Sequence, residues 1–229
     1  MSLTPLFSQE DLSREQILRA LEGNELHDTS RVDYYNELAW PVYSYDQADS
    51  SIYYAEKAIE LSKKLNDLKR LSVAHRRIGI TYANISDIKS AIFHQEESYR
   101  ISKEIGFKRG MLLALNNIGV AYLNNEVLNT ALTYFLNSLK IAEETGDFSS
   151  APSIYANCGM IYRRTGDLER SKDYFMKAKY YSDLQKNAEM QMISNSNLST
   201  SYRLLKNLDS AAYYLEEAKK YYNDNTSSS

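Results

Sequence analysis

The sequence predicts an all-α protein of about five helix-turn-helix repeats, preceded by one further helix. Small residues recur every 40 positions without a slip, and apolar residues lie three or four apart on one face of each expected helix. The chain also holds only 8 glycines and 3 prolines among 229 residues, which argues against a sheet protein rich in tight turns. A fixed period of this length is typical of stacked two-helix units.

The first expected element is a helix over residues 9–21, "QEDLSREQILRAL", whose apolar residues fall on one side. We expect Ser8 or Asp11 to cap its N-terminus, because their side-chain oxygens can accept hydrogen bonds from free backbone N–H groups. Residues 1–30 are therefore assigned to an expression remnant, "MSL", followed by this helix, which should cover the first repeat as a lid.

Five repeats are expected over residues 31–225, and residues 226–229 form a polar tail. The expected bounds of the repeats are 31–70, 71–110, 111–150, 151–190 and 191–225. The first helix of each repeat carries a small residue at one position, namely Ala39, Gly79, Gly119, Gly159 and Ser199. A glycine inside a helix costs about 1 kcal/mol relative to alanine. Because small side chains let crossing helices approach, we expect Gly119 to face Ala131 or Ser138 of its partner helix.

The turns between helices carry residues that end one helix and begin the next. In "TGDLERS", Gly166 suits the position just after a helix C-terminus, and Asp167 can cap the following helix. Pro152 fits the first turn of a new helix.

Two repeats depart from this pattern. Pro41 lies inside the expected first helix of repeat one, so we expect a kink or an early break there. The second repeat has Gln95 at a position that later repeats fill with Phe135, Phe175 and Leu215, so its core should be thinner.

The pattern of a small residue, a tyrosine three positions later, and then Ala, aromatic and Ala on the second helix resembles the tetratricopeptide repeat family. The best match is "NNIGVAYLNNEVLNTALTYFLNSLKIAEETGD", and the resemblance covers residues 33–223. It implies a right-handed superhelical solenoid. The period exceeds the family's usual repeat of about 34 residues. The long period and the first repeat resemble the sensory arrays of bacterial sensor histidine kinases and related regulators.

The resemblance also implies that the first helices line a concave surface, with the position two before the small residue pointing into it. Three of the five repeats have asparagine there, and an amide offers a donor and an acceptor to a peptide main chain. Arginine can bind a carboxylate through two hydrogen bonds. The candidate peptide-binding residues are Arg76, Arg77, Asn116, Asn117, Asn124, Asn157, Arg163, Arg164, Asn197 and Arg203. The alternative is that the asparagines bond one another or local backbone groups, without any ligand.

Tyrosines form a further series. One position of the second helices holds Tyr54, His94, Tyr134, Tyr174 and Tyr214. Rings with a polar tip suit half-buried seams between stacked units, and a ligand platform is the alternative. The segment "AAYYLEEAKKYYNDNTSSS" has four tyrosines that one final helix cannot bury, namely Tyr213, Tyr214, Tyr221 and Tyr222. We therefore expect either a longer chain or a homodimer formed through this edge.

No pattern of catalytic or metal-binding residues is recognisable. The histidines, His27, His75 and His94, occur singly, and Cys158 occupies a position where other repeats have Leu or Ile. A net charge of −3 does not indicate a nucleic-acid partner, and no apolar run approaches the roughly 18–20 residues of a membrane span. We expect neither catalysis nor a cofactor.

The preferred hypothesis is a non-enzymatic scaffold that binds a polypeptide segment, possibly acidic, and serves as the sensing module of a bacterial signal-transduction protein. The alternative is a self-associating structural array or an adaptor without sensory output. The compartment stays open, because an array cut from a membrane-bound sensor can be periplasmic or cytoplasmic.

Overall fold

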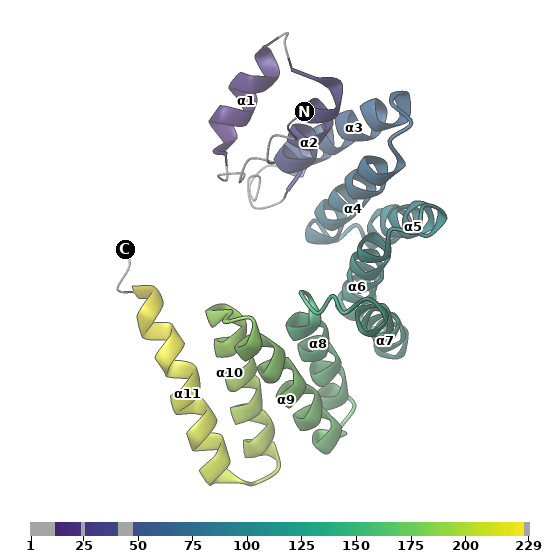
Figure 1. Ribbon diagram of the computed structural model, residues 1–229. Coiled ribbons are helices and arrows are strands. Elements are labelled where there is room, and N and C mark those ends of the chain that lie inside the picture. The colour runs from purple at the N-terminus through teal and green to yellow at the C-terminus, as the bar shows by residue number, and fades with distance from the viewer. Residues whose placement is uncertain (1–11, 24–25, 41–47, 227–229) are drawn as a thin grey trace. The chain divides into compact units, whose positions relative to one another are not determined.

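The structure, a computed structural model, describes residues 12–23, 26–40 and 48–226, and side chains as far as residue 221 (Figure 1). This part of the chain contains eleven helices and no strand, which confirms the predicted all-α class. Five helix-turn-helix pairs follow one N-terminal helix, as predicted. The chain divides into two compact units, residues 1–105 (unit 1) and 106–229 (unit 2).

Unit 1 holds the N-terminal helix and two helix pairs. Its elements are α1 (Arg14–Glu22), α2 (Asp28–Leu38), α3 (Ala48–Lys64), α4 (Leu68–Asn84) and α5 (Ile88–Glu104). Each helix packs on the next one along the chain, and α2 also contacts α4. The first helices of repeats one and two therefore lie side by side.

Unit 2 holds three helix pairs. Its elements are α6 (Lys108–Asn124), α7 (Leu128–Thr145), α8 (Ala151–Arg164), α9 (Leu168–Leu184), α10 (Ala188–Leu204) and α11 (Leu208–Thr226). Besides the contacts within each pair, α7 packs on α8 and α9 packs on α10. The first helices α6 and α8 contact one another, and so do α8 and α10. This arrangement aligns equivalent positions of the three repeats.

The start of α1 differs from the prediction. Helix α1 begins at Arg14, and Ser13 caps it by accepting a hydrogen bond from the backbone N–H of Gln16. The Gln16 side chain in turn accepts from the Ser13 backbone, at 2.7 Å. The expected caps, Ser8 and Asp11, were wrong and lie outside the described residues. The reciprocal pair prevails because it satisfies two backbone donors at once.

The predicted turn signals are confirmed. Gly166 adopts the left-handed conformation, with φ of +85°, directly after α8 and its C-cap. The Asp167 side chain accepts a hydrogen bond from the backbone N–H of Arg170 and so caps α9. Pro152 lies in the first turn of α8. Helix α2 ends at Leu38, an early break as expected, although Pro41 itself lies outside the described residues.

The prediction that Gly119 faces Ala131 or Ser138 of the partner helix was wrong. A Cβ atom at Gly119 would lie 2.7 Å from Cε1 of Phe135, and neither Ala131 nor Ser138 is among the nearest atoms. Phe135 is fully buried. The glycine therefore leaves room for an aromatic ring of the partner helix, rather than for a second small residue.

The same relation recurs in two other repeats. A Cβ at Gly159 would lie 2.9 Å from the ring of Phe175, and one at Gly79 would lie 2.6 Å from Nε2 of Gln95. Gln95 is 1% exposed and donates a hydrogen bond to the carbonyl of Arg76 at 2.9 Å. In the second repeat, therefore, the buried Gln95 side chain takes the place of the phenylalanine ring, and its amide N–H group has a hydrogen-bond acceptor.

The tyrosine series is half-buried, as expected, but its ring contacts lie within repeats. Tyr122 stacks on Tyr134 with ring centroids 5.5 Å apart, and Tyr82 stacks on His94 at the same separation. Equivalent pairs join the first and second helices of the last two repeats. The Tyr214 hydroxyl also reaches the preceding repeat, at 3.5 Å from Sδ of Met176.

Candidate functional site

Three asparagines of unit 2 occupy the same position in successive repeats. Asn117 lies on α6, Asn157 on α8 and Asn197 on α10, and all three side chains are half-buried. Because α8 contacts both α6 and α10, these equivalent positions form a row across the three first helices. We call this set the amide row. Its members combine hydrogen-bond donors and acceptors at regular intervals along one face.

Arg163 links two helices beside the amide row. Its guanidinium, on α8, donates a hydrogen bond to Oδ1 of Asn197 on α10, at 3.1 Å. The guanidinium carbon also lies 5.4 Å from the centre of the Phe175 ring. Burial lowers the pKa of Arg163, although an arginine remains protonated at any physiological pH. This contact fixes one cation at the end of the row.

The other candidates of unit 2 differ in their surroundings. The Asn116 side-chain oxygen is buried, and no described residue donates a hydrogen bond to it. Arg164 forms an ion pair with Glu126 at 2.8 Å, so its charge is already compensated. Asn124 and Arg203 are exposed on the last turns of α6 and α10.

The remaining two candidates belong to unit 1. Arg77 lies over the indole of Trp40, with its guanidinium carbon 3.9 Å from the ring centroid. Its guanidinium is also 3.6 Å from the carboxylate of Glu37. Arg76, the neighbouring residue, is half-buried. Arg77 thus has intramolecular partners, which the sequence spacing did not reveal.

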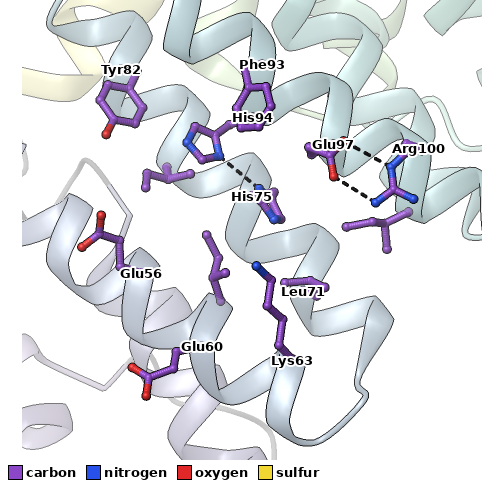
Figure 2. Close-up of a pocket in the computed structure, with 13 residues that line it drawn as sticks. Glu56, Glu60, Lys63, Leu71, His75, Tyr82, Phe93, His94, Glu97 and Arg100 are labelled. Carbon is purple, nitrogen blue, oxygen red and sulfur yellow. Dashed lines mark hydrogen bonds and ion pairs between the residues drawn. The ribbon is translucent and has the colours of Figure 1, made fainter.

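A pocket in unit 1 escaped the sequence analysis. It has a volume of about 660 Å³ and is lined by α3, α4 and α5 (Figure 2). His75 on α4 and His94 on α5 line it, with their Nδ1 atoms 3.0 Å apart. The prediction that the histidines occur singly was wrong for this pair. The available signal was His94 itself, because it replaces a tyrosine in a series whose rings contact the first helix.

The electrostatics of this pair keep it uncharged at neutral pH. Burial, followed by the repulsion of His94, lowers the pKa of His75 to about 4. Burial also lowers the pKa of His94. A hydrogen bond from Arg100 lowers the pKa of Glu97, and the two side chains form an ion pair at 2.9 Å. Because neither ring is charged, one imidazole N–H can donate a hydrogen bond to the lone pair of the other ring without repulsion between two cations.

The single cysteine of the chain lies in the core of unit 2. Cys158 is fully buried, and burial raises the pKa of its thiol to about 12, so it behaves as a small apolar residue, as expected. Among the described residues, no three side chains of His, Cys, Asp or Glu gather to hold a metal ion. No described helix combines the length and apolarity that crossing a membrane requires.

Two segments of unit 2 match models of known protein families. Residues 111–145 and residues 152–187 each match a family described as "Tetratricopeptide repeat". These segments correspond to α6/α7 and α8/α9. A comparison with curated protein sequences finds no match.

Solved structures share the fold at low sequence identity. Aspartyl phosphate phosphatase F from Bacillus subtilis is 16% identical, with a TM-score of 0.69 over 91% of this chain and 63% of its own. A signal-transduction ATPase with a tetratricopeptide repeat sensor, from Pyrococcus horikoshii, is 20% identical, with a TM-score of 0.76 over 89% of this chain and 32% of its own.

A third structure contains a bound peptide. The Rap conjugation gene regulator of plasmid pLS20, in complex with the Phr* peptide, is 18% identical, with a TM-score of 0.68 over 86% of this chain and 56% of its own. In all three comparisons the chain spans less than two thirds of the other protein. The likeness establishes the fold of the helix pairs.

Proposed function

Given that this chain is a tetratricopeptide-repeat protein, we propose that it is a non-enzymatic scaffold that binds a polypeptide segment through the amide row. We further propose that it acts as the partner-sensing module of a bacterial signal-transduction protein. The observation that carries the proposal is the recurrence of a half-buried asparagine at one position of α6, α8 and α10.

The spacing of the amide row suits an extended peptide. Packed helices lie about 8–10 Å apart. An extended chain rises about 3.3 Å per residue, so each interval of the row corresponds to roughly three peptide residues. A segment of about six residues would span all three rungs. An amide side chain offers a donor and an acceptor to a peptide main chain, and Oδ1 of Asn197, which accepts from Arg163, retains a second lone pair.

The preference for an acidic segment rests on the arginines beside the row. Arg163 uses one N–H group on Asn197, and a guanidinium has five N–H donors in total. The donors left over suit a carboxylate, which guanidinium groups bind through two parallel hydrogen bonds. Arg203, exposed on the last turn of α10, adds a second cation on the same helix as Asn197.

The fold comparisons support the sensing role. The Rap regulator of plasmid pLS20 was solved in complex with a peptide. The archaeal ATPase carries its tetratricopeptide repeats as a sensor. One is described as a gene regulator and the other as a signal-transduction ATPase, and both exceed this chain in length.

The test is a selection of binders followed by a matched pair of variants. A phage library of random dodecapeptides is selected on the full chain, and the enriched peptides are measured by fluorescence anisotropy. We expect the triple change of Asn117, Asn157 and Asn197 to alanine to abolish binding, with unchanged helicity and melting temperature. The control changes Asn129 and Asn137 to alanine, since both are exposed on α7 outside the row. Equal binding by the triple variant would refute the proposal.

A second candidate function, self-association through α11, is favoured by its exposed apolar side chains. Leu208 is 67% exposed, Tyr213 is 58% exposed and Leu215 is 46% exposed. Leu208 and Leu215, seven positions apart, fall on one face of α11, and Tyr213 lies on another side of the helix. Sedimentation velocity tests this candidate. A concentration-dependent dimer that the pair Tyr213→Lys and Leu215→Lys converts to a monomer would support it, whereas a monomer at the highest concentration would refute it.

A further inference from the structure

We propose that the pocket of unit 1 binds a small organic cation, with an apolar body against the pocket floor and an amine facing the carboxylates of α3. The pocket, at about 660 Å³, has the size of typical small-molecule sites. It shares no residue with the amide row, so it is a second binding site beyond the proposed function.

The floor of the pocket is apolar. Ile78 is 1% exposed, Ile101 is 2% exposed and Leu71 is 7% exposed, and all three line the cavity. They come from α4 and α5, which pack against each other. Because these side chains are already almost entirely out of water, a ligand seated on them would gain mainly from its own apolar surface, at about 25 cal/mol for each Å² that it removes from water.

The wall formed by α3 is negative. Glu56 and Glu60 lie one helical turn apart on α3 and line the pocket, and Figure 2 shows both carboxylates on the same side of it. Like charges at this spacing weaken an isolated helix by a few tenths of a kcal/mol. Glu60 has Lys57 at 3.6 Å, but the Glu60 side chain remains 77% exposed. A cation held between the two carboxylates would relieve their repulsion.

The charges of the other walls do not cancel this wall. Arg100 is held by Glu97 at 2.9 Å and by Glu104 at 3.6 Å. Three carboxylates and two cations line the pocket, so its net charge is −1 with neutral imidazoles. The other cation, Lys63, belongs to α3 as well, and Figure 2 shows its ammonium group directed toward His75. Glu60 is paired with Lys57 of the same helix, whereas Glu56 forms no ion pair within the described residues, so Glu56 is the carboxylate left to meet a bound cation.

Aromatic rings complete the site. Phe93 is 57% exposed at the rim, although it is a large apolar side chain. The Tyr82 ring stacks on His94 with centroids 5.5 Å apart and planes 5° apart. Ring faces attract cations within about 6 Å of their centres. In the histidine pair, one Nδ1–H donates to the other Nδ1, so one Nε2 accepts and the other donates, which suits a polar ligand atom.

The experiment uses two fluorescent probes of similar size and opposite charge. Dansylcadaverine carries an ammonium group, and dansylglycine carries a carboxylate. Fluorescence titration of the full chain at pH 7.5 should show dansylcadaverine binding about tenfold tighter, a difference set by the charge of the wall. Equal affinity for the two probes would mean non-specific apolar binding and would overturn the proposal.

Matched variants place the binding in the pocket. The pair Glu56→Gln and Glu60→Gln should weaken dansylcadaverine about fivefold, as expected for two partly solvated ion pairs. The control pair, Glu96→Gln and Glu143→Gln, removes the same charge from exposed positions outside the pocket and should change nothing. If both pairs weaken binding equally, the effect is one of net charge, and the proposed site is wrong.

A blocking variant tests the cavity itself. Ile59 lines the pocket from α3 and is half-buried, so Ile59→Trp should fill the space and abolish dansylcadaverine binding. Circular dichroism checks that the variant keeps its helicity. Retained binding of dansylcadaverine by the folded Ile59→Trp variant would overturn the proposal. So would a wild-type chain that binds the peptide acetyl-Trp-Lys-amide but does not bind dansylcadaverine. The triple asparagine variant should bind dansylcadaverine normally, which separates this test from that of the amide row.

Discussion

Replacing Gly119 with alanine tests how the helix pairs fit together. The added Cβ would lie 2.7 Å from Cε1, 2.8 Å from Cδ1 and 3.1 Å from Cζ of Phe135. Carbon atoms in favourable contact are about 3.5–4.0 Å apart. Phe135 is fully buried, so its ring has no solvent-filled space into which it can turn. The ring and the two helix backbones must therefore move by several tenths of an ångström.

The magnitude follows from two opposing effects. Extra volume in a packed core costs about 1–3 kcal/mol. Alanine in place of a helical glycine contributes about 1 kcal/mol in the opposite direction. Because the clash involves three ring atoms, we expect Gly119→Ala to lower the free energy of unfolding of unit 2 by about 1 kcal/mol.

A double-mutant cycle isolates the contact. Phe135→Leu removes the ring atoms that the new Cβ would meet. Repeat five already has a similar combination, because its equivalent positions hold Ser199, which has a Cβ, and Leu215. Urea unfolding followed by circular dichroism is measured for both single variants and the double variant. The loss of unfolding free energy in the double variant should be at least about 1 kcal/mol smaller than the sum of the losses in the two single variants. Neighbouring residues in contact show coupling energies of about 0.5–3 kcal/mol. A coupling of zero, or a Gly119→Ala variant more stable than the wild type, would refute the reasoning.

Three further predictions concern pH, capping and the buried thiol. Because the pKa of His75 is about 4 when folded and about 6.5 when unfolded, the unfolded chain binds more protons between these values. His75 alone should therefore lower the stability of unit 1 by up to about 1.4 kcal/mol per pH unit on acidification from pH 6.5 to 4, and His94, whose pKa is also lowered, adds to this loss. His75→Gln should make the slope less steep in urea titrations. Asp167→Ala removes the N-terminal cap of α9 and should lower the free energy of unfolding by about 1 kcal/mol, measured as a lower midpoint of urea unfolding. Asp167→Asn keeps a capping oxygen and should retain most of this stability. A thiol reagent should modify Cys158 only upon unfolding, and modification at the same rate in native buffer would contradict its burial.

Local features of the fold could be predicted because they depend on residues a few positions apart. The helix pairs follow from apolar spacing, and the turn after α8 follows from Gly166 and from the capping oxygen of Asp167. The glycine is not required for this turn, because Ser86, Glu126 and Lys206 adopt a positive φ at the equivalent positions of other repeats. The cap of α1 was misplaced by a few residues, since several nearby side chains could have served and only the reciprocal bond of Ser13 and Gln16 decides.

The partners of the candidate site residues needed the tertiary structure. The hydrogen bond of Arg163 to Asn197 and the contact of His75 with His94 each join two helices, and Arg77 of α4 lies over Trp40, just after the end of α2. A helix turns by about 100° per residue, so a small rotation about its axis changes which side chains meet across a packed pair. The sequence by itself therefore determined the all-helical class, the repeat and the row of asparagines. Only the packing of helix on helix decided that Phe135 fills the space beside Gly119, and that two histidines close a pocket.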